Sequence, residues 1–157
     1  MRTLIKDGHL IDPANKRNGK FDVLINKGKI EAVEPSGKLK DIADSKTIDA
    51  KGAIVAPWFC DMHVHFREPG HEYKETIQTG SESAAAGGFT TVAVMPNTSP
   101  VNDNRSVTDF ILTQAKETSS INILPIGAIT KGLKGEALSD MGELKDCLLY
   151  TSDAADE

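Results

Sequence analysis

Apolar and polar residues alternate through the first fifty positions, and turn-forming residues separate the short apolar runs. Alternation of this kind is typical of short β-strands with one buried face. Residues 21–25 and 30–33 alternate on either side of residues 26–29, which predicts a β-hairpin. Two other short runs flank Asp7-Gly8, where we expect a turn. Strands this short bury little surface, so they need a partner surface to be stable.

The pattern changes at Ile54 to strands that alternate with helices. We predict strands at 54–66, 89–95 and 121–129, and helices at 76–86 and 104–116. Successive βα units form a parallel sheet covered by helices. The sequence therefore predicts an α/β protein, with residues 1–53 as a β part and residues 54–146 as three βα units.

Composition and charge narrow the classes of function. The chain has 157 residues, with 18 basic and 23 acidic side chains and a formal net charge of −5. The strongly basic surface typical of nucleic-acid binders is therefore not expected. No apolar run approaches the roughly 18 residues of a membrane helix, so we expect no membrane partner. Cys60 and Cys147 form no CxxC pair, which argues against a zinc ribbon or a disulfide scaffold and favours a cytoplasmic location.

The end of the chain fits neither pattern. Residues 138–146 are helix-like, but residues 147–157, CLLYTSDAADE, offer no convincing strand and no cap. This segment resembles the translation of a sequencing adapter. We therefore expect residues 147–157 to be foreign and the natural sequence to continue differently after Asp146.

The segment DMHVHFREPG carries the candidate chemistry. Its polar side chains occupy alternate positions: Asp61, His63, His65 and Arg67. On a strand such residues share one face, and we expect this face to be buried in a barrel interior, where four polar groups are costly unless they have a role. Histidines at i and i+2 can bind one metal ion, although zinc needs further ligands from elsewhere in the fold. A chance pair on a surface strand is the alternative.

Several separated motifs occur together in one order: DMHVHFREPG, EYKETIQTG and AAAGGFTTVAVMPNTSP. Over residues 1–146 the chain resembles the dihydroorotase family of bacterial type, within the amidohydrolase superfamily. The resemblance implies the N-terminal part of a (β/α)₈ TIM barrel, preceded by part of a small β-sandwich that both chain ends build. It also implies zinc-dependent interconversion of N-carbamoyl-L-aspartate and L-dihydroorotate, in de novo pyrimidine synthesis.

The resemblance assigns roles to individual residues. His63 and His65 match the first two metal ligands, for one or two zinc ions. His65, Arg67 and Asn97 match substrate-binding positions, and Asp61 is expected to orient an imidazole. The family's catalytic aspartate and later ligands belong to strands beyond this chain, so we assign no catalytic residue and expect no turnover by the chain alone. A small-molecule substrate is implied, and a homo-oligomer is left open.

Two other readings and one departure accompany this resemblance. A hydantoinase or allantoinase would open another cyclic amide, but Arg67 suits a substrate carboxylate that hydantoin lacks. A catalytically silent scaffold would have no use for His63 and His65. The family usually has glycine after Pro57, where this chain has Trp58, so we expect backbone strain or altered packing there.

Overall fold

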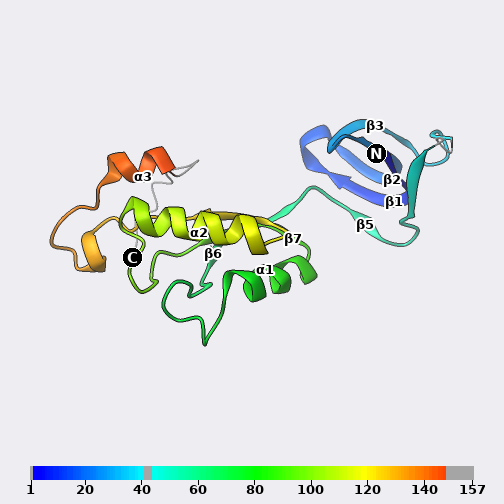
Figure 1. Cartoon of the computed structure of the whole chain (residues 1–157). Helices are drawn as coiled ribbons and strands as arrows, with labels where there is room; N and C mark the ends of the chain where they lie inside the picture. The colour runs from blue at the N-terminus through cyan, green and yellow to red at the C-terminus, as the bar shows by residue number, and fades with distance from the viewer. Residues whose placement is uncertain (1, 41–43, 148–157) are drawn as a thin grey trace. The chain divides into compact units, whose positions relative to one another are not determined.

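The computed structural model describes residues 2–40 and 44–147. The chain divides into two compact units, and the division falls between Pro57 and Trp58 (Figure 1). The first unit is a β-sheet, and the second alternates strands with helices. The predicted α/β class is therefore confirmed. Among the described residues, no helix is both long enough and apolar enough to cross a membrane.

The first unit is one five-stranded sheet. Its strands are β1 (Arg2–Asp12), β2 (Arg17–Asn26), β3 (Lys29–Pro35), β4 (Ser45–Asp49) and β5 (Ile54–Val55), with a short 3₁₀ turn, η1 (Pro13–Asn15). The order is β3-β2-β1-β4, and β5 also pairs with β1. The predicted hairpin is confirmed, because β2 and β3 are antiparallel. Lys27 and Gly28 have φ of 49° and 75°, as a tight two-residue hairpin turn requires.

Asp7-Gly8 does not form the turn that we expected. It lies inside β1, where three steps from Ile5 to Gly8 correspond to two steps along β2. Asp22, which is fully buried, explains this bulge. Its carboxylate accepts the N–H of Asp7 at 3.0 Å and the N–H of Gly37 at 2.8 Å. A side chain on β2 thus satisfies the backbone group that the bulge removes from the ladder.

The boundary after residue 53 is also corrected. We expected Ile54 to begin the first barrel strand, but Ile54 and Val55 pair with His9 and Leu10 of β1. The barrel-type strand begins only at Phe59. An apolar run alone could not show this break, because both halves of the run are strand-forming.

The second unit contains three parallel strands in the order β6-β7-β8. Its elements are β6 (Phe59–Val64), α1 (Ile77–Ala86), β7 (Phe89–Val94), α2 (Arg105–Thr118), β8 (Asn122–Pro125), η2 (Lys131–Leu133) and α3 (Met141–Cys147). The first two helices and β7 agree with the prediction. β8 is shorter than predicted, and α3 begins later because Leu138 pairs with Thr130. Asp140 then accepts the N–H of Glu143 at the start of α3. Residues 148–157, the rest of the segment expected to be foreign, lie outside the described residues.

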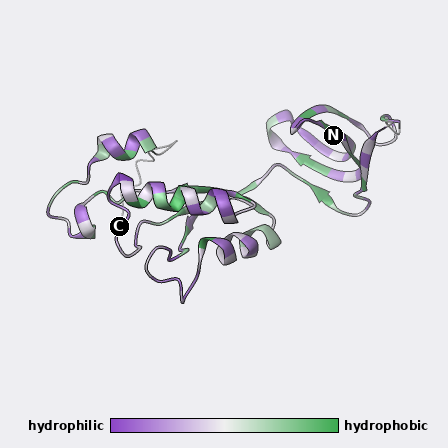
Figure 2. Cartoon of the chain, viewed as in Figure 1, coloured by the Kyte–Doolittle hydropathy of each residue, from purple (hydrophilic) through white to green (hydrophobic). Residues whose placement is uncertain are grey.

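One apolar core joins the strands of this unit to α1 and α2. It consists of Phe66, Ile77, Val92, Val94, Val107, Ile111 and Ile123. Because it combines residues of both helices with residues of β7 and β8, the two helices pack on the same face of the sheet. Hydrophobic and hydrophilic residues alternate along α2 in Figure 2, as expected for a helix with one buried side.

Local sequence fixes where these helices begin. Thr76 caps α1 in a capping box with Thr79, and Asn104 caps α2 by accepting the N–H of Val107. Of the two effects expected at Trp58, the strain of a left-handed φ is not found, since Trp58 is not among the described residues with positive φ. Trp58 is 65% exposed.

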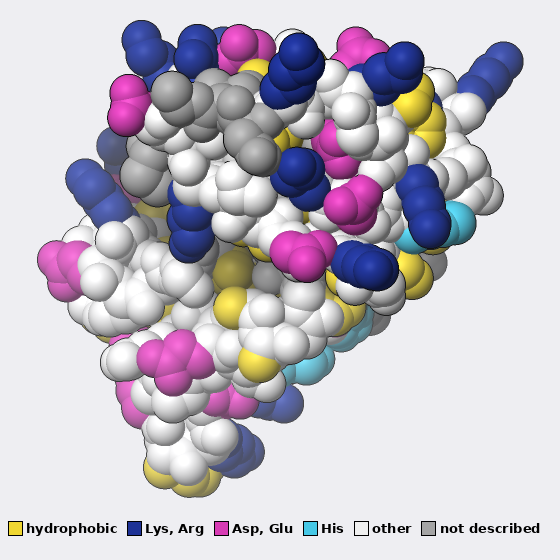
Figure 3. Space-filling model, turned by 90° about the vertical axis from the view of Figure 1, so that its right-hand side faces the viewer, with side chains coloured by type: hydrophobic (Ala, Val, Ile, Leu, Met, Phe, Trp, Pro, Cys, Tyr) yellow, Lys and Arg dark blue, Asp and Glu magenta, His cyan; other side chains and the backbone are white. Residues whose placement is uncertain are grey.

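On the face drawn in Figure 3, basic side chains are interspersed with acidic ones.

Candidate metal and substrate site

The predicted site residues come together at the carboxyl ends of β6 and β7. His65 directly follows β6, and Asn97 lies three residues after the end of β7. The N–H of Met95 donates to the carbonyl of Val64 at 2.9 Å, which extends the pairing beyond both strands. Because parallel strands end at the same edge of a sheet, this extension brings residues 32 positions apart into contact.

His63 and His65, here called the histidine pair, have their Nε2 atoms 3.2 Å apart. Their ring centroids are 5.1 Å apart, and the ring planes are inclined by 68°. With Zn–N bonds of about 2.05 Å, this Nε2 separation of 3.2 Å corresponds to an angle of about 103° at an ion, near the tetrahedral value of about 109°. The pair therefore fits two positions of a zinc site. No third His, Cys, Asp or Glu joins it in the described part of the chain.

Asn97 contacts the other nitrogen of His65. Its Oδ1 lies 2.9 Å from Nδ1 of His65. An amide oxygen only accepts hydrogen bonds, so in this arrangement Nδ1 carries a proton, and in the neutral imidazole Nε2 then has the lone pair. Lone pairs on Nε2 are what metal binding by the histidine pair requires.

Arg67 and Asn97 each occupy the centre of a three-residue turn. The N–H of Glu68 donates to the carbonyl of Phe66 across Arg67, and the N–H of Thr98 donates to the carbonyl of Pro96 across Asn97, both at 2.8 Å. Arg67 has a φ of 62°, a sparsely populated conformation for a residue with a side chain. Such conformations persist where the surroundings hold them, often at ligand sites.

Asp61 does not take the position that we predicted. Three steps from Asp61 to Val64 correspond to two steps along β7, so a bulge interrupts the alternation between Asp61 and the histidine pair. Its Oδ1 accepts the backbone N–H of His63 at 3.0 Å rather than an imidazole N–H. The expected orientation of an imidazole by Asp61 is therefore corrected, and the side chain that contacts an imidazole is that of Asn97.

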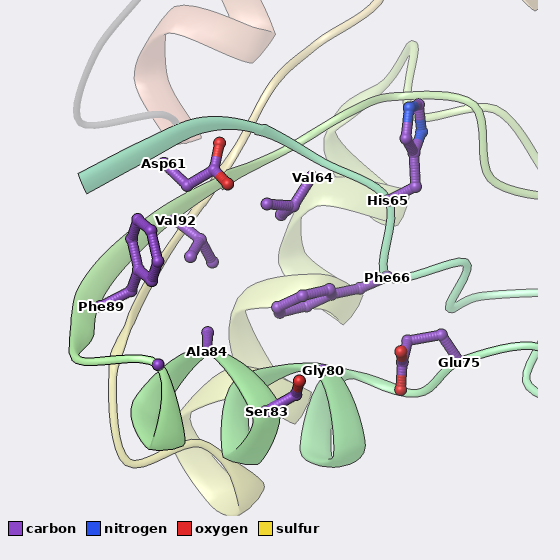
Figure 4. Close-up of a pocket in the computed structure, with 11 residues that line it drawn as sticks. Asp61, Val64, His65, Phe66, Glu75, Gly80, Ser83, Ala84, Phe89 and Val92 are labelled. Atoms are coloured by element: carbon purple, nitrogen blue, oxygen red, sulfur yellow. The ribbon is translucent and has the colours of Figure 1, made fainter. Parts of the chain in front are cut away.

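Asp61 instead lines a hollow of about 330 Å³ between β6 and α1. Val64, Phe66, Gly80 and Ala84 also line it. Figure 4 shows the ring of His65 directed away from α1 and from the ring of Phe66, with Asp61 at the opposite end of the segment. His65, Glu75 and Ser83 line it too, so the hollow borders the histidine site, while its apolar part belongs to the packing between strand and helix.

The described residues alone do not enclose the polar face, so its burial in a barrel interior stays a prediction. His63 is exposed, while His65, Arg67 and Asn97 are half-buried. β6 is an edge strand of the described sheet, so no neighbouring strand covers its outer side in the described part of the chain. The described residues thus form one wall of a site and not an enclosed interior.

Sequence reasoning missed the residues that hold the two loops in place. Oε2 of Glu68 accepts the N–H of Ile77 at 2.7 Å and so anchors the loop after β6 to the start of α1. The N–H of Ser99 donates to the carbonyl of Pro69 at 2.9 Å and ties the loop after β6 to the loop after β7. The dipeptide Pro69-Gly70 was the feature of the sequence that could have indicated this contact between the two loops, since a glycine allows close approach of another backbone.

Glu72 stabilises the outer part of the loop after β6. Its Oε1 accepts the N–H of Gly70 at 2.7 Å. This hydrogen bond is the main reason that the pKa of the Glu72 carboxyl lies below its ordinary value. The carboxylate is therefore the form that the loop favours.

Comparison with known families agrees with these observations. The model of the family described as "Dihydro-orotase-like" matches residues 52–155. That match runs past residue 147, so the foreign origin of residues 147–157 stays a prediction.

Curated relatives extend the likeness to nearly the whole chain. A "Dihydroorotase" of Geobacter metallireducens is 51% identical over 98% of this chain and 36% of its own length. A "Dihydroorotase" of Syntrophotalea carbinolica is 50% identical, with the same coverage. The chain thus spans about a third of the length of these relatives.

Solved structures support the same fold. An L-hydantoinase from Arthrobacter aurescens aligns with a TM-score of 0.74 at 25% identity, over 92% of this chain and 30% of that one. At 92% coverage, the alignment includes residues of both units of this chain.

Proposed function

The chain belongs to the dihydro-orotase-like family, and from this premise we propose that it forms part of a zinc-dependent dihydroorotase. The reaction is the reversible cyclisation of N-carbamoyl-L-aspartate to L-dihydroorotate, a step in pyrimidine synthesis. The observation that carries the proposal is the grouping of the histidine pair with Asn97 at one end of a parallel sheet. Ligand sites of α/β proteins lie at this end of the strands.

The histidine pair would hold the metal ion. Nε2 of His63 and Nε2 of His65 converge at a separation that suits zinc, and the hydrogen bond from His65 to Asn97 fixes one ring. When bound, zinc supplies Lewis acidity towards water and towards an amide carbonyl. The site would hold one or two zinc ions. The remaining metal ligands and the catalytic acid or base would come from the later part of the barrel.

Arg67 and Asn97 would bind the substrate carboxylate. A guanidinium presents two parallel N–H groups to a carboxylate, and in the described part of the chain the side chain of Arg67 makes no hydrogen bond or ion pair that would compete. Asn97 uses Oδ1 for His65, which leaves its amide N–H groups to donate to substrate. His65 would also contact the substrate, at the part of the substrate that lies next to the metal ion.

A hydantoinase is the second candidate, because the chain is 25% identical to an L-hydantoinase of the same fold. Two observations favour dihydroorotase. Curated relatives that carry that name are about 50% identical, and Arg67 suits a substrate with a free carboxylate, which hydantoin lacks. A silent scaffold is disfavoured by the geometry of the histidine pair.

The setting of the proposed enzyme follows from its reaction. Its substrate is a small molecule, and we propose a cytoplasmic location with no nucleic-acid or membrane partner. A homo-oligomer is compatible with this proposal. We also propose that residues 58–146 are the first βα units of an eight-stranded barrel, and that residues 147–157 are not native.

Substrate preference tests the proposal in the full-length protein as its source encodes it. Cyclisation of N-carbamoyl-L-aspartate is compared with ring opening of hydantoin for wild type, Arg67→Ala and the control Arg105→Ala. Arg105 is an exposed arginine paired with Asp109. We expect Arg67→Ala to lower kcat/KM for cyclisation by about 10- to 100-fold, as loss of charge-assisted hydrogen bonds implies. Hydantoin opening that exceeds cyclisation in wild type would contradict the proposal, and so would full cyclisation activity in Arg67→Ala.

A further inference from the structure

The contact between His65 and Asn97 is held from both sides. Next to His65, Met95 N–H donates to the carbonyl of Val64, and beyond Asn97, Ser99 N–H donates to the carbonyl of Pro69, each at 2.9 Å. Both side chains are half-buried, and Thr98 beside Asn97 is buried. The distance of 2.9 Å between Nδ1 and Oδ1 is thus set by two backbone hydrogen bonds that bracket it.

We infer that Asn97 is a positioning residue for the metal ligand His65, in addition to its proposed contact with substrate. Oδ1 of Asn97 accepts the Nδ1 proton of His65 and holds the ring as the Nδ1–H tautomer, with Nε2 directed at His63. A partner on the second nitrogen fixes both the tautomer and the rotation of a ligating imidazole. The inference rests on the proposed function only where zinc is concerned, because the tautomer exists without metal.

The inference makes the histidine pair asymmetric before metal binds. If Nε2 of His65 has no proton, the 3.2 Å contact must take its proton from Nε2 of His63. For both Nε2 atoms to bind zinc, this proton must leave Nε2 of His63. Nδ1 of His63 has no hydrogen-bond partner among the described residues, so it is open to carry the proton in place of Nε2. His65 keeps one tautomer throughout, whereas His63 changes tautomer.

The hydrogen bond to His65 uses only the oxygen of the Asn97 amide. The two N–H groups of this amide have no hydrogen-bond partner among the described residues. A substrate carboxylate can take these donors without disturbing His65. The two functions of Asn97 therefore use different atoms and can be separated by substitution.

The test uses the full-length protein labelled with ¹⁵N in its histidines, and His65→Gln identifies the His65 signals. Ring ¹⁵N shifts report the tautomer in metal-free protein, and competition with a chelator gives the zinc Kd. Asn97→Ala removes both functions of the amide, whereas Asn97→Asp keeps an acceptor for His65 but loses the donors. Asn18→Ala is the matched control, because Oδ1 of Asn18 lies 2.8 Å from Nε2 of His9 in the first unit.

We expect His65 to be the Nδ1–H tautomer in wild type and in Asn97→Asp. In Asn97→Ala we expect mixed tautomers and zinc binding weakened by about 10- to 100-fold. Asn97→Asp should keep its zinc and raise KM for N-carbamoyl-L-aspartate, and Asn18→Ala should match wild type. An Nε2–H tautomer of His65 in wild type overturns the inference even if Asn97→Ala fails to fold. Unchanged tautomer and zinc Kd in a folded Asn97→Ala overturn it as well. Absence of zinc binding or cyclisation in wild type would instead count against the proposed function.

Discussion

Gly80 in α1 lies directly against the ring of Phe66, and a Cβ added to Gly80 would be 2.5 Å from Cδ1 of that ring. Phe66 is buried, and it separates His65 from Arg67 in the sequence. The absence of a side chain at position 80 therefore lets the helix approach the segment that carries the site. Helix packing and site geometry are thus coupled through one ring.

Substitution of Gly80 by alanine should move Phe66. Overpacking of a core usually costs about 1–3 kcal/mol, which here exceeds the roughly 1 kcal/mol that alanine gains over glycine in a helix. We expect a lower midpoint of urea denaturation and weaker zinc binding by the full-length protein. The double variant Gly80→Ala/Phe66→Leu should recover part of both losses, because leucine leaves room for the added methyl group. Equal losses in the single and double variants would contradict this explanation.

The loop that carries Asn97 depends on a buried side chain, Asn102. Asn102 is fully buried, and its Nδ2 donates to the carbonyl of Ile126 at 2.9 Å while its Oδ1 accepts the hydroxyl of Thr108 at 2.7 Å. Its own N–H donates to the carbonyl of Pro96 beside Asn97. Asn102 thus links the loop after β7 to α2 and to the end of β8.

We expect Thr108→Val to destabilise the protein by about 1–3 kcal/mol, because it leaves the Oδ1 of a buried amide without a donor. Thr113→Val is the matched control on the same helix. Its hydroxyl donates to the carbonyl of Asp109 at 2.7 Å, but in an exposed position, so we expect a change within about 0.5 kcal/mol. The denaturation midpoints of the two variants are compared. Equal losses of stability would show that the buried hydrogen bond contributes no more than the exposed one.

Gly70 allows the loops after β6 and β7 to touch. Its φ is +95°, and a Cβ there would overlap the carbonyl oxygen of Ser99. Gly70→Ala should force the two loops apart and raise KM for N-carbamoyl-L-aspartate. Gly28→Ala is the control, since Gly28 has a φ of +75° but no neighbour within 4 Å of an added Cβ. It should cost about 1–2 kcal/mol from backbone strain alone and leave KM unchanged. A KM that rises equally in both variants would refute the loop contact.

The hydrogen bond from Gly70 to Glu72 should titrate. Because the N–H of Gly70 lowers the pKa of Glu72, this contact stabilises the folded loop at pH values above the ordinary carboxyl pKa. The stabilisation is lost as the pH falls through the lowered pKa of the folded state. We expect the amide proton shift of Gly70 to follow this titration in wild type and to lose it in Glu72→Gln. A Gly70 shift that titrates identically in both proteins would exclude the contact.

Part of this structure was visible in the sequence because it depends on local pattern. The alternation on both sides of residues 26–29 predicts the hairpin, and the spacing of His63 and His65 brings their Nε2 atoms together. Helices α1 and α2 follow from apolar spacing and capping residues. Each of these features is set within a few residues of the chain.

The features that sequence reasoning missed depend on distant partners. The bulge at Asp7 is held by Asp22, and the one after Asp61 appears only when β6 is paired with β7. The strand at Ile54 belongs to the first unit and not to the second, because it pairs with β1. The hydrogen bond between His65 and Asn97 joins residues 32 positions apart, so no local pattern could predict it.

The metal content of the full-length protein tests the central claim most directly. Bound zinc is measured for wild type, His63→Ala, His65→Ala and the control His9→Ala, which removes a histidine of the first unit. Zinc bound in wild type and in His9→Ala, but lost or strongly depleted in both site variants, is the result that we predict. Stoichiometric zinc in His63→Ala and His65→Ala would contradict the account.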